Sequence, residues 1–192
     1  MTVFASISSK HVRYNIDMEA FWFIFGAIII ILAFMFLMTA FTGAPYVPSS
    51  ASELEEAFTK LYKLDKKDFL IDLGSGDGIV LKVAHKHGAR ALGVEINPIL
   101  VLLTKIRLRK YDNISAICRN FFTMDFPAET TVVYAFGDSR DINKIATLIK
   151  KQAAKIGHPI YLISNAFEIR GMEAQKQHRA HYLYELGGKD ED

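Results

Sequence analysis

A glycine-rich turn between a short apolar run and a helical segment is the part of this chain best suited to chemistry. The run DLGSGDG at residues 72–78 follows the apolar residues 69–71 and precedes a helical pattern at 79–87. A strand, a glycine turn and a helix start together form a nucleotide-binding loop, because the N–H groups at the helix start face the ligand. The glycines let the chain turn sharply and approach a ligand with no Cβ in between.

The spacing and charge of this turn favour a cationic ligand over a pyrophosphate. A dinucleotide-binding turn has the spacing G-x-G-x-x-G, whereas the glycines here follow G-x-G-x-G. Asp72 and Asp77 would repel phosphate groups and attract an amine or a sulfonium. Glu95 ends the next predicted strand, where a carboxylate can accept hydrogen bonds from two ribose hydroxyls. S-adenosylmethionine contains a ribose, an amine and a sulfonium and has no phosphate, so the pattern predicts this cofactor.

Alternating strands and helices must position this turn. Apolar runs predict strands at 69–72, 91–95, 114–118, 131–135, 160–167 and 181–186. Helical patterns lie at 50–63, 79–88, 97–110 and 141–155. Ser50 and Glu53 form a predicted capping box for the first of these helices, and Leu100, Leu103 and Ile106 are expected to face the core. This order predicts an α/β fold with a mostly parallel sheet, helices on both faces and an antiparallel last strand.

The glycine loop and a second motif resemble a known superfamily. Residues 72–78, together with the run GVEINP at 93–98, resemble the first two motifs of class I S-adenosylmethionine-dependent methyltransferases. An apolar segment, the run PYVP at 45–48, a helix and this loop also resemble the membrane-anchored protein-lysine methyltransferases. That family includes enzymes acting on the ATP synthase c subunit and the adenine nucleotide translocase, with short prokaryotic relatives. The resemblance covers about residues 20–135 and implies a Rossmann-like methyltransferase sheet.

The resemblance also implies roles for individual side chains. The loop would hold the methionine part of the cofactor, Glu95 the ribose and Ile96 the adenine. Asn120 stands where the family usually has an acid for the adenine amino group, and Phe121 either contacts adenine or packs in the core. Tyr46 either closes over the cofactor as a lid or anchors the linker at lipid headgroups. The expected cofactor-binding residues are Tyr46, Asp72, Gly74, Ser75, Gly76, Gly78, Glu95, Ile96, Asn120 and Phe121.

The acceptor site is less clearly marked. The run FGDSR at 136–140 lacks the Asp/Asn-Pro-Pro-aromatic loop with which DNA amino-methyltransferases hold a flipped base. Asp138 either binds a cationic substrate amine or caps a helix, and Glu168 is a second candidate for the amine. The small net charge of +2 gives no case for nucleic acid, and the histidines show no metal-ligand spacing. Cys118, the only cysteine, lies in a predicted strand and is expected to be a buried small hydrophobe.

An uncharged run at residues 20–41 predicts a membrane anchor. At about 1.5 Å per residue its 22 residues span roughly 33 Å, the thickness of a bilayer core. We expect a polar segment at 1–19, a single transmembrane helix at 20–41, a linker or lid at 42–49 and a methyltransferase domain at 50–192. By the positive-inside rule, Lys10 and Arg13 favour a cytosolic N-terminus. The cofactor argues for the opposite orientation, because S-adenosylmethionine is made in the cytosol. We therefore expect the catalytic domain in the cytosol and the short N-terminus outside.

These features together predict a membrane-anchored, S-adenosylmethionine-dependent protein-lysine N-methyltransferase that acts on a membrane protein. Two alternatives remain open at this point. One is an anchored methyltransferase for a lipid or another small hydrophobic acceptor, which the anchor would serve equally well. The other is a non-catalytic protein that only binds the cofactor, which the unusual run at 136–140 allows.

Overall fold

The structure, a computed structural model, describes residues 18–42, 50–136 and 141–187, with side chains placed in all of these except 34–42. The chain divides into two compact units, Met1–Gly43 and Ala44–Asp192. The described residues of the first unit form helix α1 (Met18–Thr42), which begins two residues before the predicted run 20–41. Within the described residues, no helix meets the length and apolarity needed to cross a bilayer, so the predicted anchor is not confirmed.

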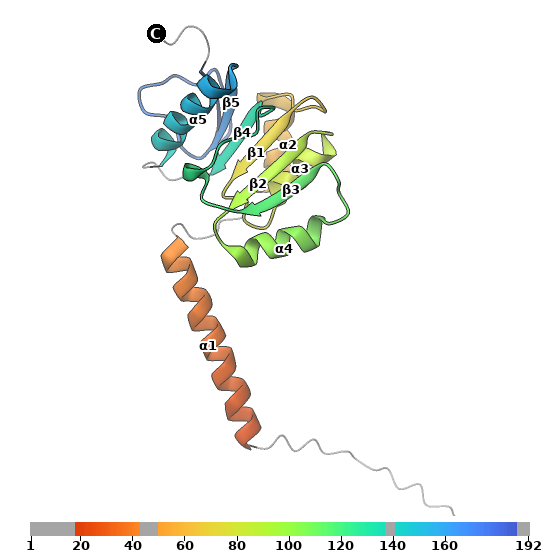
Figure 1. The fold of residues 1–192 in the computed structure, drawn as a ribbon, viewed down its shortest axis with the longest axis vertical. Helices are drawn as coiled ribbons and strands as arrows, with labels where there is room; N and C mark the ends of the chain where they lie inside the picture. Colours follow the sequence, from red (N-terminus) through yellow and green to blue (C-terminus); the bar gives the residue numbers. More distant parts are fainter. Residues whose placement is uncertain (1–17, 43–49, 137–140, 188–192) are drawn as a thin grey trace, which may run out of the picture. The chain divides into compact units, whose positions relative to one another are not determined.

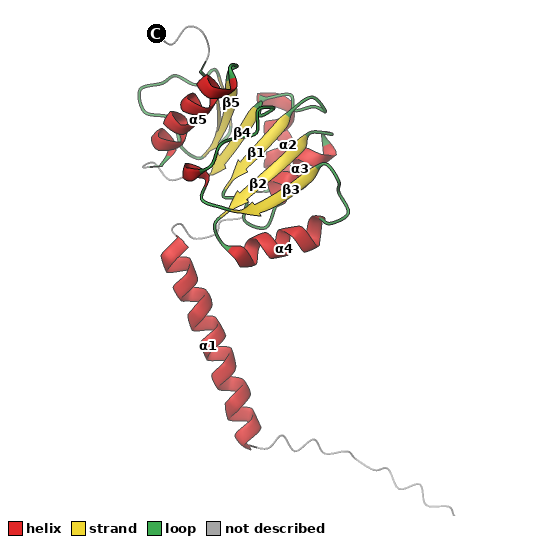
Figure 2. Ribbon diagram, viewed as in Figure 1, coloured by secondary structure: helices red, strands yellow, loops and turns green. Residues whose placement is uncertain are grey.

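The second unit is built on a seven-stranded sheet with the order β3-β2-β1-β4-β5-β7-β6. Figures 1 and 2 show β3, β2, β1, β4 and β5 side by side in this order. Its strands are β1 (Phe69–Leu73), β2 (Arg90–Glu95), β3 (Ile114–Cys118), β4 (Val132–Phe136), β5 (Ile160–Asn165), β6 (Lys176–His178) and β7 (His181–Leu186). The first five are parallel, whereas β7 pairs antiparallel with β5, and β6 pairs antiparallel with β7. The predicted mixed sheet is confirmed. The short strand β6 was not predicted, because its sequence Lys-Gln-His has no apolar alternation.

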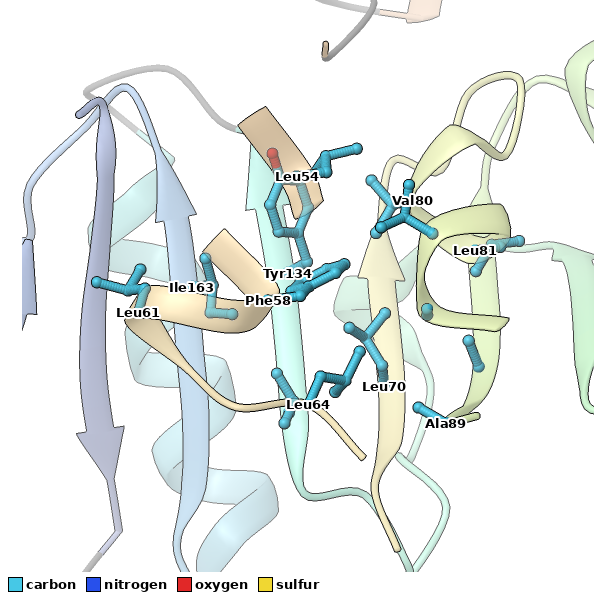
Figure 3. Close-up of a cluster of buried hydrophobic side chains, with 14 of the residues drawn as sticks. Leu54, Phe58, Leu61, Leu64, Leu70, Val80, Leu81, Ala89, Tyr134 and Ile163 are labelled. Atoms are coloured by element: carbon cyan, nitrogen blue, oxygen red, sulfur yellow. The ribbon is translucent and has the colours of Figure 1, made fainter. Parts of the chain in front are cut away.

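Helices cover both faces of this sheet (Figure 2). They are α2 (Ala51–Glu56), the π-helical turn η1 (Ala57–Leu61), α3 (Ile79–Lys86), α4 (Pro98–Leu108), the 3-10 turn η2 (Phe121–Thr123) and α5 (Ile142–Ile156). One cluster of buried side chains joins α2, η1, α3 and α4 to the sheet, and a second cluster joins α5 to it. In the first cluster, Phe58 packs edge-on against Tyr134 with ring centroids 6.2 Å apart (Figure 3).

The start of α2 differs from the predicted capping box. Ser50 is the N-cap residue, but its side chain makes no capping hydrogen bond, and its Oγ lies 2.8 Å from the Oγ of Ser52. Glu53 does not reach back to the helix start, because its carboxylate lies 3.9 Å from the guanidinium of Arg179. The helix begins where predicted, but the predicted capping interaction is wrong.

The orientation of α4 also differs from the prediction. Val101, Thr104 and Leu108 face the core, whereas Leu103 and Ile106 are exposed. Hydrophobicity alone favoured the opposite rotation, because the leucines and isoleucines of this helix are more apolar than Thr104. The predicted N-cap is confirmed, since the Asn97 side chain accepts hydrogen bonds from the N–H groups of Ile99 and Leu100.

Cys118 is exposed instead of buried. It is the last residue of β3, which lies at the edge of the sheet. Of the five residues of β3 only Ala116 is buried, so the layers on the two faces of the sheet cover this edge strand poorly and leave Cys118 open to solvent.

The contact between β7 and the segment after β5 supports a stability prediction. The hydroxyl of the buried Tyr184 accepts a hydrogen bond from the backbone N–H of Ile169 at 3.0 Å. Tyr184→Phe would leave this buried N–H without a partner, so the free energy of unfolding should fall by about 1–3 kcal/mol. Urea denaturation measures the change. The control is Tyr111→Phe, whose hydroxyl makes no hydrogen bond within the described residues and whose loss should change stability little. Equal stability of the two variants would contradict the prediction.

Candidate functional site

The predicted glycine loop lies at the point of the sheet where strand order reverses. It follows β1, whose two neighbours are β2 and β4. Helices α3 and α4 pack on one face of the sheet and α5 on the other. In sheets of this kind, ligands bind beyond the carboxyl ends of the strands at the point where strand order reverses. The segments after β2, β3 and β5 leave the sheet at this same edge, because these strands run parallel to β1.

Backbone hydrogen bonds fold the loop toward β2. The N–H groups of Gly74 and Ser75 both donate to the carbonyl of Val94, at 2.8 and 3.2 Å. The N–H of Gly78 donates to the carbonyl of Ser75 at 2.8 Å and closes a turn. Gly74, Gly76 and Gly78 have φ values of 83°, 51° and 80°, a region that favours glycine.

Two glycines allow other elements to approach the loop closely. A Cβ on Gly78 would lie 2.7 Å from Thr104 and 2.9 Å from Leu108, so this glycine admits α4 rather than the sheet. A Cβ on Gly93, in β2, would lie 2.6 Å from the Oγ of Ser75 and 2.8 Å from Leu81. Gly93 therefore makes room for the loop over β2. Its place in the predicted motif was recognised, but its steric role was not.

Glu95 is tied to the loop and to the start of α4. Its Oε2 accepts a hydrogen bond from the N–H of Gly76 at 3.0 Å, and its Oε1 accepts one from the N–H of Asn97 at 2.9 Å. The side chain is buried. A carboxylate has about four acceptor sites, so each oxygen keeps a lone pair for a ligand hydroxyl.

Asp72 is a buried carboxyl group with one oxygen unpartnered among the described residues. It is 3% exposed, and its Oδ2 makes no hydrogen bond to any described residue. Burial, together with the nearby charges of Glu95 and Asp77, raises the pKa of Asp72 well above its ordinary value. The Oγ of Ser75 and the Oδ1 of Asp77 are likewise buried and unpartnered within the described part of the chain. Unpaired buried acceptors are costly, so this group of atoms fits a ligand that donates hydrogen bonds and carries positive charge.

Asp77 does not face such a ligand with a free charge. Its Oδ2 forms a 2.6 Å ion pair with Arg107 of α4. The ion pair with Arg107 offsets the charge of Asp77, whereas Asp72 has no ion pair among the described residues. The attraction of a cationic ligand by Asp77 stays a prediction. A cation thirty residues away in the sequence could not be assigned to Asp77 from spacing alone.

Helix α4 holds the loop from the outside through one more contact. The buried hydroxyl of Thr104 donates to the carbonyl of Gly76 at 3.0 Å. Neither Thr104 nor Arg107 was predicted as a site residue. The available signal was a threonine within an otherwise apolar helix, at a position where a polar side chain needs a partner.

The residues expected near the adenine lie at the ends of β2 and β3. Ile96 directly follows Glu95 and is exposed. Asn120 is exposed and caps η2, since its Oδ1 accepts a hydrogen bond from the N–H of Phe122 at 3.0 Å. Phe121 packs partly against the core, as one of its two predicted alternatives required, and its ring lies 4.5 Å from that of Phe122. The adenine contacts of Ile96, Asn120 and Phe121 stay predictions.

Three other residues were predicted as site residues from the sequence: Tyr46, Asp138 and Glu168. Tyr46 and Asp138 lie outside the described residues. Glu168 is exposed in the segment that follows β5. The pKa of Tyr182 is raised, first by the desolvation of Tyr182 and then by its hydrogen bond with Glu168. The described part of the chain holds no cluster of side chains that could bind a metal ion.

Comparisons with known proteins agree with this geometry. The family described as the ANTKMT methyltransferase domain matches residues 72–176. A lysine N-methyltransferase of Caenorhabditis elegans, named for the ATP synthase c subunit, is 34% identical over 99 residues, which are 47% of this chain and 52% of that protein. A protein-lysine N-methyltransferase of Saccharolobus islandicus is 30% identical over 157 residues, which are 74% of this chain and 94% of that protein.

A solved structure resembles the fold as well. An RNA methyltransferase of Salinibacter ruber, in complex with S-adenosyl-L-homocysteine, has a TM-score of 0.63 and 26% identity, covering 73% of this chain and 92% of that one.

The adenine nucleotide translocase lysine N-methyltransferase of Mus musculus is 37% identical over 75 residues, 38% of this chain and 32% of that protein. The chain thus spans about half or less of the length of the two animal relatives.

The raised pKa of Asp72 makes a prediction about stability and pH. The pKa is higher in the folded chain than in the unfolded chain, so the folded state holds an extra proton between the two values. The free energy of unfolding should therefore fall as the pH rises from about 4 toward the folded pKa. Asp72→Asn should remove this slope and stabilise the ligand-free protein above that range by about 0.5–2 kcal/mol. Urea denaturation at a series of pH values tests both points.

The matched control for Asp72→Asn is Asp112→Asn, at an exposed position before β3. This variant should keep the slope of the unmodified chain. Calorimetry should also show that Asp72→Asn binds S-adenosylmethionine more weakly, because the unpaired carboxyl group is gone. A slope that survives in Asp72→Asn would assign it to another group and contradict the prediction.

The contact between α4 and the loop supports a second prediction. Thr104→Val keeps the shape of the side chain but removes its hydrogen bond to the carbonyl of Gly76. We expect the free energy of unfolding to fall by about 1 kcal/mol and S-adenosylmethionine to bind several-fold more weakly. Thr147→Val is the control, because Thr147 is exposed and its hydroxyl donates to the carbonyl of Asn143 within the same helix, away from the loop. Unchanged cofactor affinity in Thr104→Val would show that α4 does not position the loop.

Proposed function

Since this chain belongs to the ANTKMT methyltransferase domain family of class I S-adenosylmethionine-dependent methyltransferases, we propose that it methylates a lysine side chain of a protein. The observation that carries the proposal is the unpaired, buried carboxyl group of Asp72 beneath the glycine loop, with Glu95 at the end of the neighbouring strand. Named relatives are lysine N-methyltransferases, one of which this chain covers over 94% of its length.

The residues of the loop have complementary tasks in this proposal. Bound S-adenosylmethionine supplies a methyl group on a positively charged sulfur. The carboxyl group of Asp72 pairs with the amine of the cofactor, and the remaining lone pairs of Glu95 accept hydrogen bonds from ribose hydroxyls. The backbone of 74–78 approaches the ligand closely because Gly74, Gly76 and Gly78 carry no Cβ.

The acceptor lysine needs position more than it needs acid catalysis. The leaving group of methyl transfer is a neutral thioether, so rate comes mainly from holding the amine in line, about 3 Å from the methyl carbon. The lysine must lose a proton first, which a desolvated pocket favours. Asp138 and Glu168 follow β4 and β5 in the sequence and are our candidates for holding the amine.

We also propose that the chain is anchored in a membrane by one helix and acts on a membrane protein from the cytosolic side. The support is the uncharged sequence of residues 20–41, which falls within helix α1. Two relatives act on the ATP synthase c subunit and on the adenine nucleotide translocase, by their names. The supply of S-adenosylmethionine in the cytosol supports the orientation. An anchor would keep the enzyme and a membrane-bound acceptor in one plane.

A transfer assay tests the proposed acceptor. The full chain in mild detergent is incubated with membranes and with S-adenosylmethionine that carries a labelled methyl group. We expect the label in a protein band, and as methyl-lysine after acid hydrolysis. Label in the lipid extract would favour a lipid acceptor, and label in RNA would favour the acceptor class named for the Salinibacter relative. Label in no fraction, from a chain that binds the cofactor, would indicate a non-catalytic binding protein.

Glu95→Gln tests the cofactor part of the same proposal. The amide keeps the size of the side chain but weakens its two contacts with the ribose. It also puts an NH₂ group, which cannot accept a hydrogen bond, opposite the N–H of either Gly76 or Asn97. We expect binding of S-adenosylmethionine to weaken by about 10–100-fold, as for the loss of a hydrogen bond to a charged group. Calorimetry measures the change. Glu129→Gln, at an exposed residue paired with Arg90, should bind normally, and equal affinity of both variants would refute the role of Glu95.

A further inference from the structure

The outer side of α4 exposes a continuous row of large apolar side chains. Ile99, Leu102, Leu103 and Ile106 follow the i, i+3, i+4, i+7 spacing of one helix face and are 46, 58, 46 and 56% exposed. We call these four residues the α4 apolar stripe. Ile96, just before the helix, is also half exposed and extends the row. Scattered exposed apolar residues are ordinary, but a contiguous patch marks an interaction surface.

The core of the domain does not use this stripe. The opposite side of α4 is the buried one, where Val101, Thr104 and Leu108 contact the sheet and the glycine loop. The rotation of the helix is fixed by these inner contacts, so the stripe cannot turn inward without breaking them. The stripe is therefore available to another surface.

The charges around the stripe all have one sign. Lys105, Arg107, Arg109 and Lys110 lie in the second half of the helix and just after it, and no acidic residue occurs between Glu95 and Asp112. Arg107 is paired with Asp77, on the loop side of the helix. By helical periodicity, Lys105 and Arg109 share the opposite flank of the stripe. An apolar face bordered by cations is the pattern of helices that lie in the plane of a membrane surface.

We propose that the α4 apolar stripe docks on the surface of a bilayer containing anionic lipids, with the helix axis parallel to the membrane plane. The four apolar side chains enter the boundary between headgroups and acyl chains, which removes them from water. Lys105, Arg109 and Lys110 reach the anionic headgroups with their charged ends. This contact is additional to any anchoring by α1.

The charge distribution favours a lipid surface over a second copy of this chain. Two copies packed stripe to stripe would bring the cations of both helices together, with no acidic residue on either helix to neutralise them. An anionic membrane complements the same charges and tolerates a convex helix face, which needs no matching groove. Self-association is therefore the outcome that the test must exclude.

Docking through α4 would bring the cofactor loop near the membrane. The inner side of α4 contacts the loop through Thr104 and Arg107, so only one helix diameter, about 10 Å, would separate the loop from the headgroups. The inference deepens the proposed function, on which it rests for the idea that the acceptor is membrane-bound. The docking itself can be measured without methyl transfer.

A fluorescence experiment on the full chain tests the docking. In a Cys118→Ser background, Leu103→Cys is labelled with an environment-sensitive dye, and the chain is reconstituted with vesicles of phosphatidylcholine with or without phosphatidylserine. We expect a blue shift of the dye, and quenching by lipids with nitroxide-labelled acyl chains, in vesicles that contain phosphatidylserine. The control label at Lys151→Cys lies on α5, on the other face of the sheet, and should report water in both cases.

Removal of flanking cations provides the second arm. Lys105→Gln and Arg109→Gln should each lower the ratio of docked to undocked chain roughly fivefold on phosphatidylserine vesicles. Calorimetry with S-adenosylmethionine confirms that each labelled or substituted chain is folded. Two results would overturn the proposal: a water-like dye at position 103 in chains that float with the vesicles, or a blue shift that needs no vesicles and grows with protein concentration.

Flotation and methyl transfer separate this proposal from the earlier ones. Chains that do not float with either vesicle would refute both the α1 anchor and the docking of α4. Methyl-lysine formation that persists while the dye at position 103 stays water-like would refute the docking and leave the proposed function intact.

Discussion

The contact between α4 and the glycine loop is the constraint on which the site depends. Gly78 has no Cβ, so Thr104 and Leu108 can pack directly against the loop. The hydroxyl of Thr104 then holds the carbonyl of Gly76, and Arg107 neutralises Asp77. These interactions fix the loop over the end of β1 and leave Asp72 as its unpaired acid. A side chain at position 78 would move the helix and the loop together.

The loop region contains groups that suit a ligand but destabilise the ligand-free fold. A buried carboxyl group with an unpartnered oxygen, next to the carboxylates of Glu95 and Asp77, raises the energy of the ligand-free fold. Proteins keep such groups where a ligand satisfies them. Glu95 is treated differently, because two backbone N–H groups already hold it and fix the direction of its remaining lone pairs. Asp72 is therefore suited to pair with a positive charge, whereas Glu95 is oriented to accept hydrogen bonds.

The sequence predicts the sheet well because strand alternation and glycine spacing are local signals. The order of strands and helices, the antiparallel last strand and the Asn97 cap all follow from short stretches of residues. The ion pair of Asp77 with Arg107 and the packing of Gly93 on Ser75 join residues far apart in the chain, so no local pattern reports them. The Ser50 capping box failed for the same reason, since Glu53 faces the distant Arg179.

Helix α4 has the apolar face that its sequence predicts, but this face is turned to solvent and not to the core. Ile99, Leu102, Leu103 and Ile106 do form one apolar face, but a helix with two apolar sides does not reveal which side meets the core. The decision rests with Thr104, whose hydroxyl needs the partner that the loop carbonyl provides. A polar residue that must be satisfied can thus fix the rotation of a helix against its more apolar side. The apolar side that is left outside then becomes the surface most in need of a partner.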